Sequence, residues 1–170
     1  MTDDDWFEGD TPPEEEEGQI DEYDLNSTPN DFNVLTIFSF IESGAVKIPG
    51  FQRAYVWDVR RASKLIESLI IGLPVPQVFL YEEGQNSFLV IDGQQRLMTI
   101  YYFIKQRFPK KDKRAELRRL SNEESKIPDE ILYDDGYFEN FRLSLADTST
   151  GAPNKFARLN YSTLGDYKLS

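Results

Sequence analysis

The sequence predicts an α+β fold in which a small mixed or antiparallel sheet packs with helices. Three segments carry apolar residues at helical spacing. Two short apolar runs, joined by a polar loop that contains glycine, are typical of an antiparallel hairpin. With 170 residues, of which 39% are hydrophobic, the chain is large enough for one domain with a hydrophobic core.

The first helix is expected from about residue 34. Val34, Ile37, Phe38 and Ile41 fall at i, i+3, i+4 and i+7, the spacing of one helix face. Gly44 is placed to end this helix. Candidate amino-terminal caps precede it, namely Ser27, Thr28, Asn30 and Asp31.

A short strand at 45–48, a Pro-Gly turn and an irregular segment are expected next. Asp58 has the residue type of an N-cap. The second helix is expected from Ala62, with one apolar face, and Gly72 followed by Pro74 should end it.

The hairpin is predicted from residues 77–82 and 88–91, which flank the loop 83–87. Its second strand runs into Asp92-Gly93, where the third helix is expected to begin. That helix should carry an apolar face that reaches Phe108, with a first turn that stays open.

Beyond residue 127, alternating strands around Asp135-Gly136 form a second hairpin signal. The aromatic residues expected to pack inward or across the strands are Tyr137, Phe138 and Phe141.

Composition excludes several kinds of chemistry. The chain has no cysteine and no histidine, which excludes disulfides, thiolate catalysis, cysteine-ligated zinc and a histidine base. It also has no apolar run of the roughly 20 residues that span a bilayer, and its first residues lack signal-peptide features. We therefore expect a cytoplasmic protein that does not contact membranes.

Charge is divided unevenly along the chain. Residues 1–24 hold 12 acidic and no basic residues, which leaves 18 acidic and 19 basic residues, a balance of about +1, in the remainder. We expect 1–26 to form a disordered acidic tail and 27–170 to form the domain. Two interpretations of the tail remain open: a solvated extension, or a strip that occupies a basic surface as nucleic acid would.

The sequence Asp92-Gly93-Gln94-Gln95-Arg96 is the main candidate site. Backbone N–H groups at a helix amino terminus bind anions, and Gly93 allows an anion to approach the backbone closely. Arg96 can add bidentate, charge-assisted hydrogen bonds to the anion. Asp92 would repel a phosphate unless a divalent cation lay between them or the carboxylate turned away, so the motif favours a metal-assisted nucleotide. The structural alternative is that Asp92 caps the helix, Gly93 fills a turn and Arg96 pairs with a carboxylate.

Two further segments are candidates for binding. Gln52 and Arg53 lie among Phe51, Tyr55 and Trp57, whose rings suit stacking on a base or sugar. The alternative is that these aromatic residues belong to the core and Arg53 is solvated. A basic stretch suits contact with a DNA backbone, although such stretches are also typical of solvated helix faces, and its candidate residues are Lys110, Lys111, Lys113, Arg114, Arg118 and Arg119.

Three segments together resemble a known family. IPGFQRAYVW, LPVPQVFL and IDGQQRLMTIYYF, which fall within residues 31–108, resemble the amino-terminal domain of GmrSD-type, modification-dependent restriction enzymes, a domain shared with SspE-type phage-defence proteins. The family in turn resembles the ParB and sulfiredoxin superfamily, in which a comparable motif holds nucleotide phosphates. Ala54 and Met98 depart from the usual family pattern, while every charged or amide residue of the motif is kept.

The resemblance implies a nucleoside triphosphatase that uses Mg²⁺ with ATP, GTP or CTP. It assigns Asp92, Gln94, Gln95 and Arg96 to catalysis, with Asp92 as the metal ligand. These four residues would bind the nucleotide together with Gly93, and the earlier segment would add Gln52, Arg53 and Tyr55. Sulfinic acid reduction is excluded because the sequence has no cysteine.

The resemblance also implies partners. Hydrolysis would control DNA cleavage by a nuclease domain or subunit supplied elsewhere, because the family's nuclease depends on a histidine that this chain lacks. The segment KFARLNYSTLGDYKLS resembles one that continues further in the family, so we expect a truncated domain. Two rival functions stay open, a nucleotide-switched module without turnover and a DNA-binding or inhibitory module, and oligomerisation stays open as well.

Overall fold

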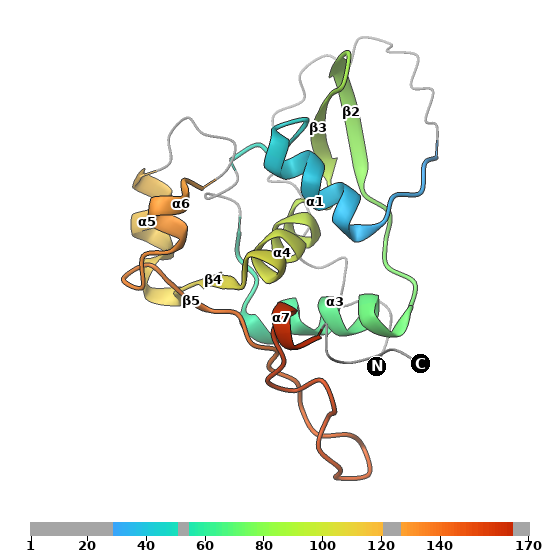
Figure 1. The fold of residues 1–170 in the computed structure, drawn as a ribbon, viewed down its shortest axis with the longest axis vertical. Coiled ribbons are helices and arrows are strands. Elements are labelled where there is room, and N and C mark those ends of the chain that lie inside the picture. Colours follow the sequence, from blue (N-terminus) through green and yellow to red (C-terminus); the bar gives the residue numbers. More distant parts are fainter. Residues whose placement is uncertain (1–28, 51–54, 121–126, 165–170) are drawn as a thin grey trace, which may run out of the picture.

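The computed structural model describes residues 29–50, 55–120 and 127–164. The fold is α+β, as the sequence predicts, with helix α4 between a hairpin on one side and helix α3 on the other (Figure 1). In chain order the elements are α1 (Val34–Ser43), β1 (Val46–Lys47), α3 (Val59–Ile71), β2 (Phe79–Gly84), β3 (Ser87–Asp92), α4 (Gln94–Lys105), β4 (Arg107–Pro109), the 3-10 helix η2 (Lys111–Lys113), α5 (Arg114–Leu120), α6 (Asp129–Leu132), β5 (Phe138–Asn140) and α7 (Tyr161–Leu164). None of the described helices is long and apolar enough to cross a membrane.

The larger sheet is mixed, which confirms one of the two predicted arrangements. Its strand order is β1-β3-β2, with β1 parallel to β3 and β2 antiparallel to β3. The predicted hairpin forms β2 and β3. Strands β4 and β5 form a separate antiparallel pair.

Helices α1 and α3 follow the predicted pattern closely. Asn33 caps α1, rather than Asn30 or Asp31, because its Oδ1 accepts the N–H of Thr36 at 2.8 Å. The other two candidates, Ser27 and Thr28, lie outside the described residues. For α3, Asp58 is the N-cap as predicted, and its Oδ1 accepts the N–H of Arg61.

Both helices end at glycine, as expected. Gly44 has φ +82° and Gly72 has φ +75°, so each residue closes its helix in the left-handed region that glycine tolerates best. The helix α3 begins at Val59, three residues before the predicted start at Ala62.

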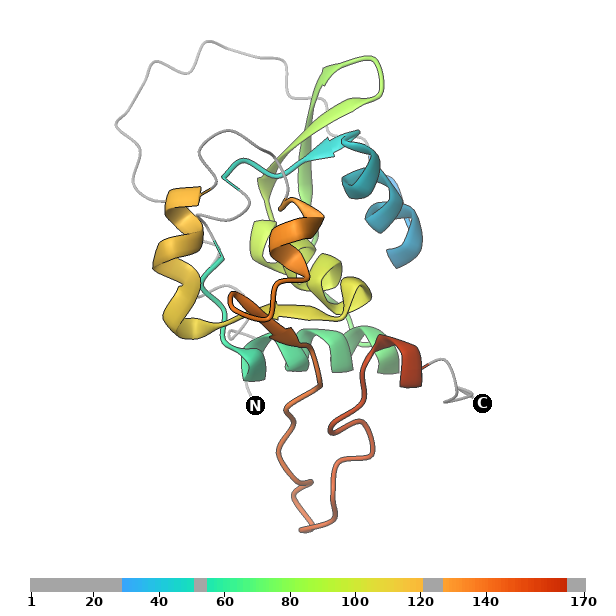
Figure 2. The same cartoon turned by 60° about the vertical axis from the view of Figure 1, so that its left-hand side comes forward.

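Helix α4 differs from the prediction at both ends. It ends at Lys105, because Gln106 adopts φ +60° and closes the helix, and Phe108 then lies in strand β4 instead of on the helix. Its first turn is not open: Gln95 is 4% and Arg96 is 2% exposed. The helix is buried along most of its length because α1, α3 and β4 pack around it (Figure 2).

The predicted second hairpin around Asp135-Gly136 is wrong. The chain before this turn forms helix α6, which follows Pro128 and carries Asp129 and Glu130 in its first turn, a favourable place for acidic side chains. Strand β5, after the turn, pairs with β4. Phe138 and Phe141 are fully buried as expected, and Tyr137 is half-buried.

Candidate functional site

The junction of β3 and α4 holds the predicted motif. Asp92 is the last residue of β3, and its Oδ1 accepts the N–H of Gly93 at 2.9 Å. Within the described part of the chain, this is the only hydrogen bond of the Asp92 side chain, and no lysine or arginine pairs with it. The carboxylate is partly exposed, so its second oxygen is available to a ligand.

Gly93 has two physical reasons to be glycine. It has φ +91°, in the left-handed region, and it is the N-cap of α4. A Cβ at this position would also lie 2.7 Å from Cγ2 of Val78 and 3.0 Å from Nη2 of Arg96. The backbone therefore passes close to residues just before β2, and any side chain would push them apart.

A register shift places two residues of β3 opposite one residue of β2. Phe79 pairs with Asp92, while Leu80 pairs with Val90, so Ile91 is the extra residue of a β-bulge. Val90 is buried at 1% exposure, whereas Ile91 is 56% and Phe79 is 50% exposed. Because a bulge re-aims the side chains beside it, Asp92 ends β3 next to an exposed apolar pair.

Gln95 and Arg96 tie the first turn of α4 to neighbouring segments. Oε1 of Gln95 accepts the N–H of Val56 at 3.0 Å. Nη2 of Arg96 donates to the carbonyl oxygen of Gln77 at 2.9 Å. Both side chains therefore hold this corner of the fold together from inside, and Arg96 does not lie at the surface as the sequence suggests.

Tyr55 lies in the core. Its hydroxyl is 3.0 Å from Oγ1 of Thr99, and that oxygen in turn donates to the carbonyl of Gln95 at 2.8 Å. Since the one hydroxyl proton of Thr99 goes to Gln95, the Tyr55 hydroxyl donates to Thr99. Burial raises the pKa of Tyr55 well above its usual range. Tyr55 is 2% and Trp57 is 1% exposed, which matches the core alternative for these aromatic residues.

The remaining predicted residues fall into two groups. Gln94 is half-buried, and its Nε2 lies 3.5 Å from the carbonyl oxygen of Val90, at the limit of a hydrogen bond. Gln52 and Arg53 lie outside the described residues. The structure therefore leaves Asp92 and Gln94 partly exposed, where a ligand has access, while Gly93, Gln95 and Arg96 are buried.

The residues that contact the motif from other parts of the chain are not evident from the sequence. Gln77 and Val78 contact the motif from a segment about 15 residues earlier, and no local pattern predicts that approach. The sequence does offer a clue to Thr99, because it is a polar residue four positions after Gln95 on an otherwise apolar stretch of helix.

Metal binding at this site would depend on the ligand as well as the protein. Among the described residues, no group of three or more His, Cys, Asp or Glu side chains could hold a metal ion. Mg²⁺ bound with a nucleotide commonly takes one or two carboxylates and completes its shell with phosphate oxygens and water. The single available carboxylate of Asp92 fits that arrangement, and it does not fit a metal held by protein alone.

The predicted basic residues lie on η2 and α5, apart from Lys110 just before η2, and they are not equivalent. Nζ of Lys113 pairs with Glu116 at 3.3 Å. The Arg114 guanidinium lies over the rings of Tyr55 and Phe108, at 5.2 and 5.4 Å, and burial lowers its pKa. The others have no acidic partner within the described ranges: Lys111, Arg118 and Arg119 are exposed and Lys110 is half-buried.

Comparison with known proteins identifies one family that matches this chain. A family model described as the N-terminal domain of GmrSD restriction endonuclease matches residues 34–166, a range that contains every element from α1 to α7 and the whole Asp92–Arg96 motif. Neither the search of curated proteins nor the search of solved structures found a match.

Proposed function

Because the chain belongs to the family of GmrSD restriction endonuclease N-terminal domains, we propose that it binds a nucleoside triphosphate with Mg²⁺ at the amino end of α4 and hydrolyses it. Membership of the family supports a role in phage-defence restriction. The nucleotide, the metal and the hydrolysis are the proposal.

The partly exposed carboxylate of Asp92, next to the first turn of α4, is the observation that carries this proposal. The first N–H groups of a helix have no acceptor inside the helix, and they favour a phosphate. An anion-binding turn that also presents a carboxylate favours a phosphate that arrives with a cation over a bare phosphate. Asp92 meets this condition because no described cation pairs with it.

The burial pattern suggests a division of roles within the motif. Asp92 would hold the metal, and Gln94, whose amide makes only a long contact to the described residues, would orient the attacking water or a phosphate oxygen. Gln95 and Arg96 would keep the first turn in place through their hydrogen bonds to Val56 and Gln77. When bound, Mg²⁺ would supply positive charge that offsets the charge developing on the phosphoryl group.

DNA is the proposed partner in the larger system. Nucleotide hydrolysis would control DNA cleavage by a nuclease domain or subunit other than this domain. The exposed residues Lys111, Arg118 and Arg119 are suited to contact the DNA backbone, because they carry charge that no described acidic side chain neutralises.

The nucleotide proposal is tested by calorimetric titration of ATP, GTP and CTP with and without Mg²⁺, followed by phosphate release. We expect Mg²⁺-dependent binding that Asp92→Asn reduces at least tenfold. Metal-free binding in this variant should be unchanged or stronger, because a repulsive charge has been removed. Glu82→Gln, an exposed acidic residue on β2, is the matched control and should behave as wild type.

Each outcome of this experiment separates the candidate functions. If no nucleotide binds to the folded wild-type protein, the nucleotide proposal is wrong. Binding with phosphate release supports a hydrolase. Binding without release supports the nucleotide-switched module instead.

DNA contact requires a separate test. Replacing Lys111, Arg118 and Arg119 by glutamine should weaken binding of duplex DNA at low salt and flatten its salt dependence, by about 0.9 in log–log slope for each phosphate that the variant no longer neutralises. Arg142→Gln removes an exposed positive charge elsewhere and is the control. Equal reductions per charge removed in the two proteins would mean that net charge, and not this surface, governs DNA binding.

A further inference from the structure

We propose that Phe79 stacks on the base of the nucleotide whose phosphates and metal lie at Asp92. This inference rests on the proposed function and adds a base-binding residue to it. It follows from the position of Phe79 in the sheet, from the exposure of its ring and from the burial of Tyr55 and Trp57.

The pairing of β2 with β3 brings Phe79 to Asp92. The two residues are register partners, and directly opposite residues of an antiparallel pair have Cβ atoms about 5 Å apart. The β-bulge at Ile91 places Ile91 and Asp92 together opposite Phe79. A ligand held by the Asp92 carboxylate therefore lies within reach of an aromatic side chain on the neighbouring strand.

Phe79 is available in a way that the other aromatic candidates are not. Its side chain is 50% exposed, and it is not part of the core cluster or of the residues packed against that cluster. Tyr55 and Trp57 are almost fully buried, so they present no ring face to a ligand in this structure. An exposed phenyl ring has no polar atom that needs a hydrogen bond. Covering its face with a flat aromatic group is favourable because it removes apolar surface from water.

The two residues before Phe79 fix the position of its backbone, from which the ring extends. Gln77 accepts a hydrogen bond from Arg96, and Val78 lies against the backbone at Gly93. The start of β2 is thus held by the same motif that forms the proposed phosphate site. Phe79 is the next residue along the chain, so its position relative to α4 is set by the contacts of Gln77 and Val78 with the motif, although the ring itself is exposed.

The chemistry of stacking defines the ligand class. Every nucleobase has an aromatic face, so a phenyl ring supports binding of any base and discriminates weakly among them. Removing one such stacking ring weakens binding by about 5- to 100-fold. Phe79 should therefore increase the affinity for any nucleotide, and other residues should select the base.

The test compares nucleotides with inorganic tripolyphosphate, which has the phosphates but no base, in the presence of Mg²⁺. Phe79→Ala should weaken nucleotide binding about 5- to 100-fold and leave tripolyphosphate binding unchanged. Phe79→Trp should keep nucleotide binding, and its new indole should show fluorescence quenching with nucleotide and none with tripolyphosphate. Tyr81→Ala is the control, because Tyr81 is similarly exposed, at 46%, but pairs with Leu89 further along the strand.

Three results would overturn the inference while leaving the proposed function intact. One is unchanged nucleotide affinity in Phe79→Ala. Another is an equal reduction in affinity for nucleotide and tripolyphosphate, which would mean that the substitution disturbs the phosphate site. A third is an equal reduction in Tyr81→Ala. If the wild-type protein binds neither nucleotide nor tripolyphosphate, both the proposed function and this inference are wrong.

Discussion

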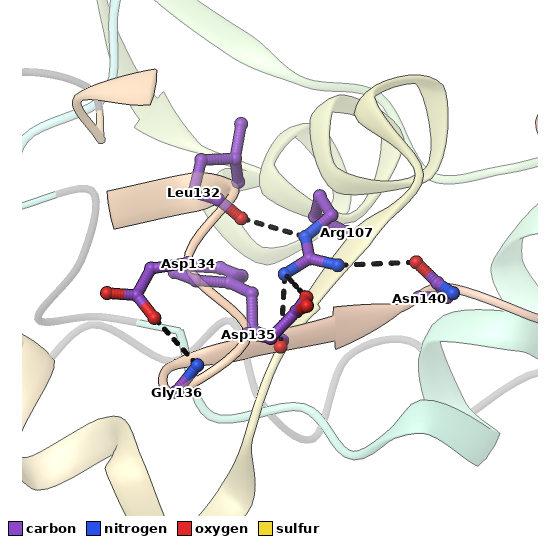
Figure 3. A network of polar contacts seen from close by, with 7 residues as sticks. Arg107, Leu132, Asp134, Asp135, Gly136 and Asn140 are labelled. Carbon is purple, nitrogen blue, oxygen red and sulfur yellow. Dashed lines mark hydrogen bonds and ion pairs between the residues drawn. The ribbon is translucent and has the colours of Figure 1, made fainter. Parts of the chain in front are cut away.

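Nη2 of Arg107 lies 2.8 Å from Oδ1 of Asp135, yet the Arg107 side chain is 8% exposed and that of Asp135 is 92% exposed (Figure 3). The same guanidinium donates to the carbonyl oxygens of Leu132 at 2.8 Å and Phe138 at 3.1 Å, and to Oδ1 of Asn140 at 3.2 Å. Arg107 therefore joins β4 to the end of α6 and to β5. The ion pair is the solvent-facing part of a buried hydrogen-bond network.

Removing the guanidinium should cost far more stability than removing the carboxylate. Arg107→Met leaves the carbonyl oxygens of Leu132 and Phe138 buried without a donor, and we expect the free energy of unfolding to fall by about 2–5 kcal/mol. Asp135→Asn removes an exposed charge and should cost less than about 1 kcal/mol. Urea unfolding measures both. Similar decreases in the two variants would show that the ion pair, and not the buried network, supplies the stability.

The tight approach at Gly93 gives a second prediction. Gly93→Ala combines an unfavourable φ of +91° with a Cβ that lies 2.7 Å from Cγ2 of Val78. We expect a decrease of about 2–4 kcal/mol in the free energy of unfolding. Gly72→Ala is the matched control, since Gly72 has φ +75° and open space around its Cβ position, and it should be destabilised by about 1 kcal/mol.

Val78→Ala tests the cause of that difference. In combination with Gly93→Ala it removes the clashing methyl group, so the double variant should be more stable than the sum of the two single effects predicts. Strict additivity would contradict the clash and leave only the backbone conformation as the cause.

Features set by neighbouring residues were predictable from the sequence. The α3 helix was predictable because Asp58, the apolar face and Gly72 all indicate the same element. The Asp92–Arg96 motif was correctly placed at a strand-to-helix junction for the same reason, since a hairpin signal and a helical pattern meet at Gly93.

Features set by distant residues were not predictable. The spacing of Phe108 fits the face of α4, but pairing with β5 places it in a strand after the left-handed Gln106. The burial of Arg96 depends on the carbonyl of Gln77, 19 residues earlier, because a charged side chain is buried only where its donors find acceptors. The bulge that sets Asp92 against Phe79 is likewise a property of strand pairing.

The hydrogen bond between Tyr55 and Thr99 gives a third prediction. Tyr55→Phe and Thr99→Val each remove one buried hydroxyl with little change in shape, and each should lower the free energy of unfolding by about 1–2 kcal/mol. Thr99→Val should cost more than Tyr55→Phe, because it also leaves the Tyr55 hydroxyl buried without an acceptor. A double-mutant cycle measures their coupling, which we expect to be at least about 0.5 kcal/mol. Zero coupling would contradict the bond.

Three buried tyrosines predict that stability falls in alkaline solution. Burial raises the pKa of Tyr55, Tyr101 and Tyr102 above the ordinary value of about 10, and the same groups titrate near 10 in the unfolded chain. Above that pH the unfolded chain releases protons that the folded protein keeps, so the free energy of unfolding falls as pH rises. Below about pH 10 the contribution of all three groups is fully present.

The slope of this decline is the measurable quantity. Each buried tyrosine contributes up to about 1.4 kcal/mol per pH unit above about pH 10, so the three contribute up to about 4 kcal/mol per unit. Urea unfolding across this range should show the decline, and tyrosinate absorbance should rise when the protein unfolds. Tyr55→Phe should reduce the slope by about a third, because one of three contributing groups is removed, and Tyr81→Phe, at an exposed position, is the control for removal of a hydroxyl. An unchanged slope in Tyr55→Phe would mean that Tyr55 ionises while the protein is still folded, which its buried bond to Thr99 opposes.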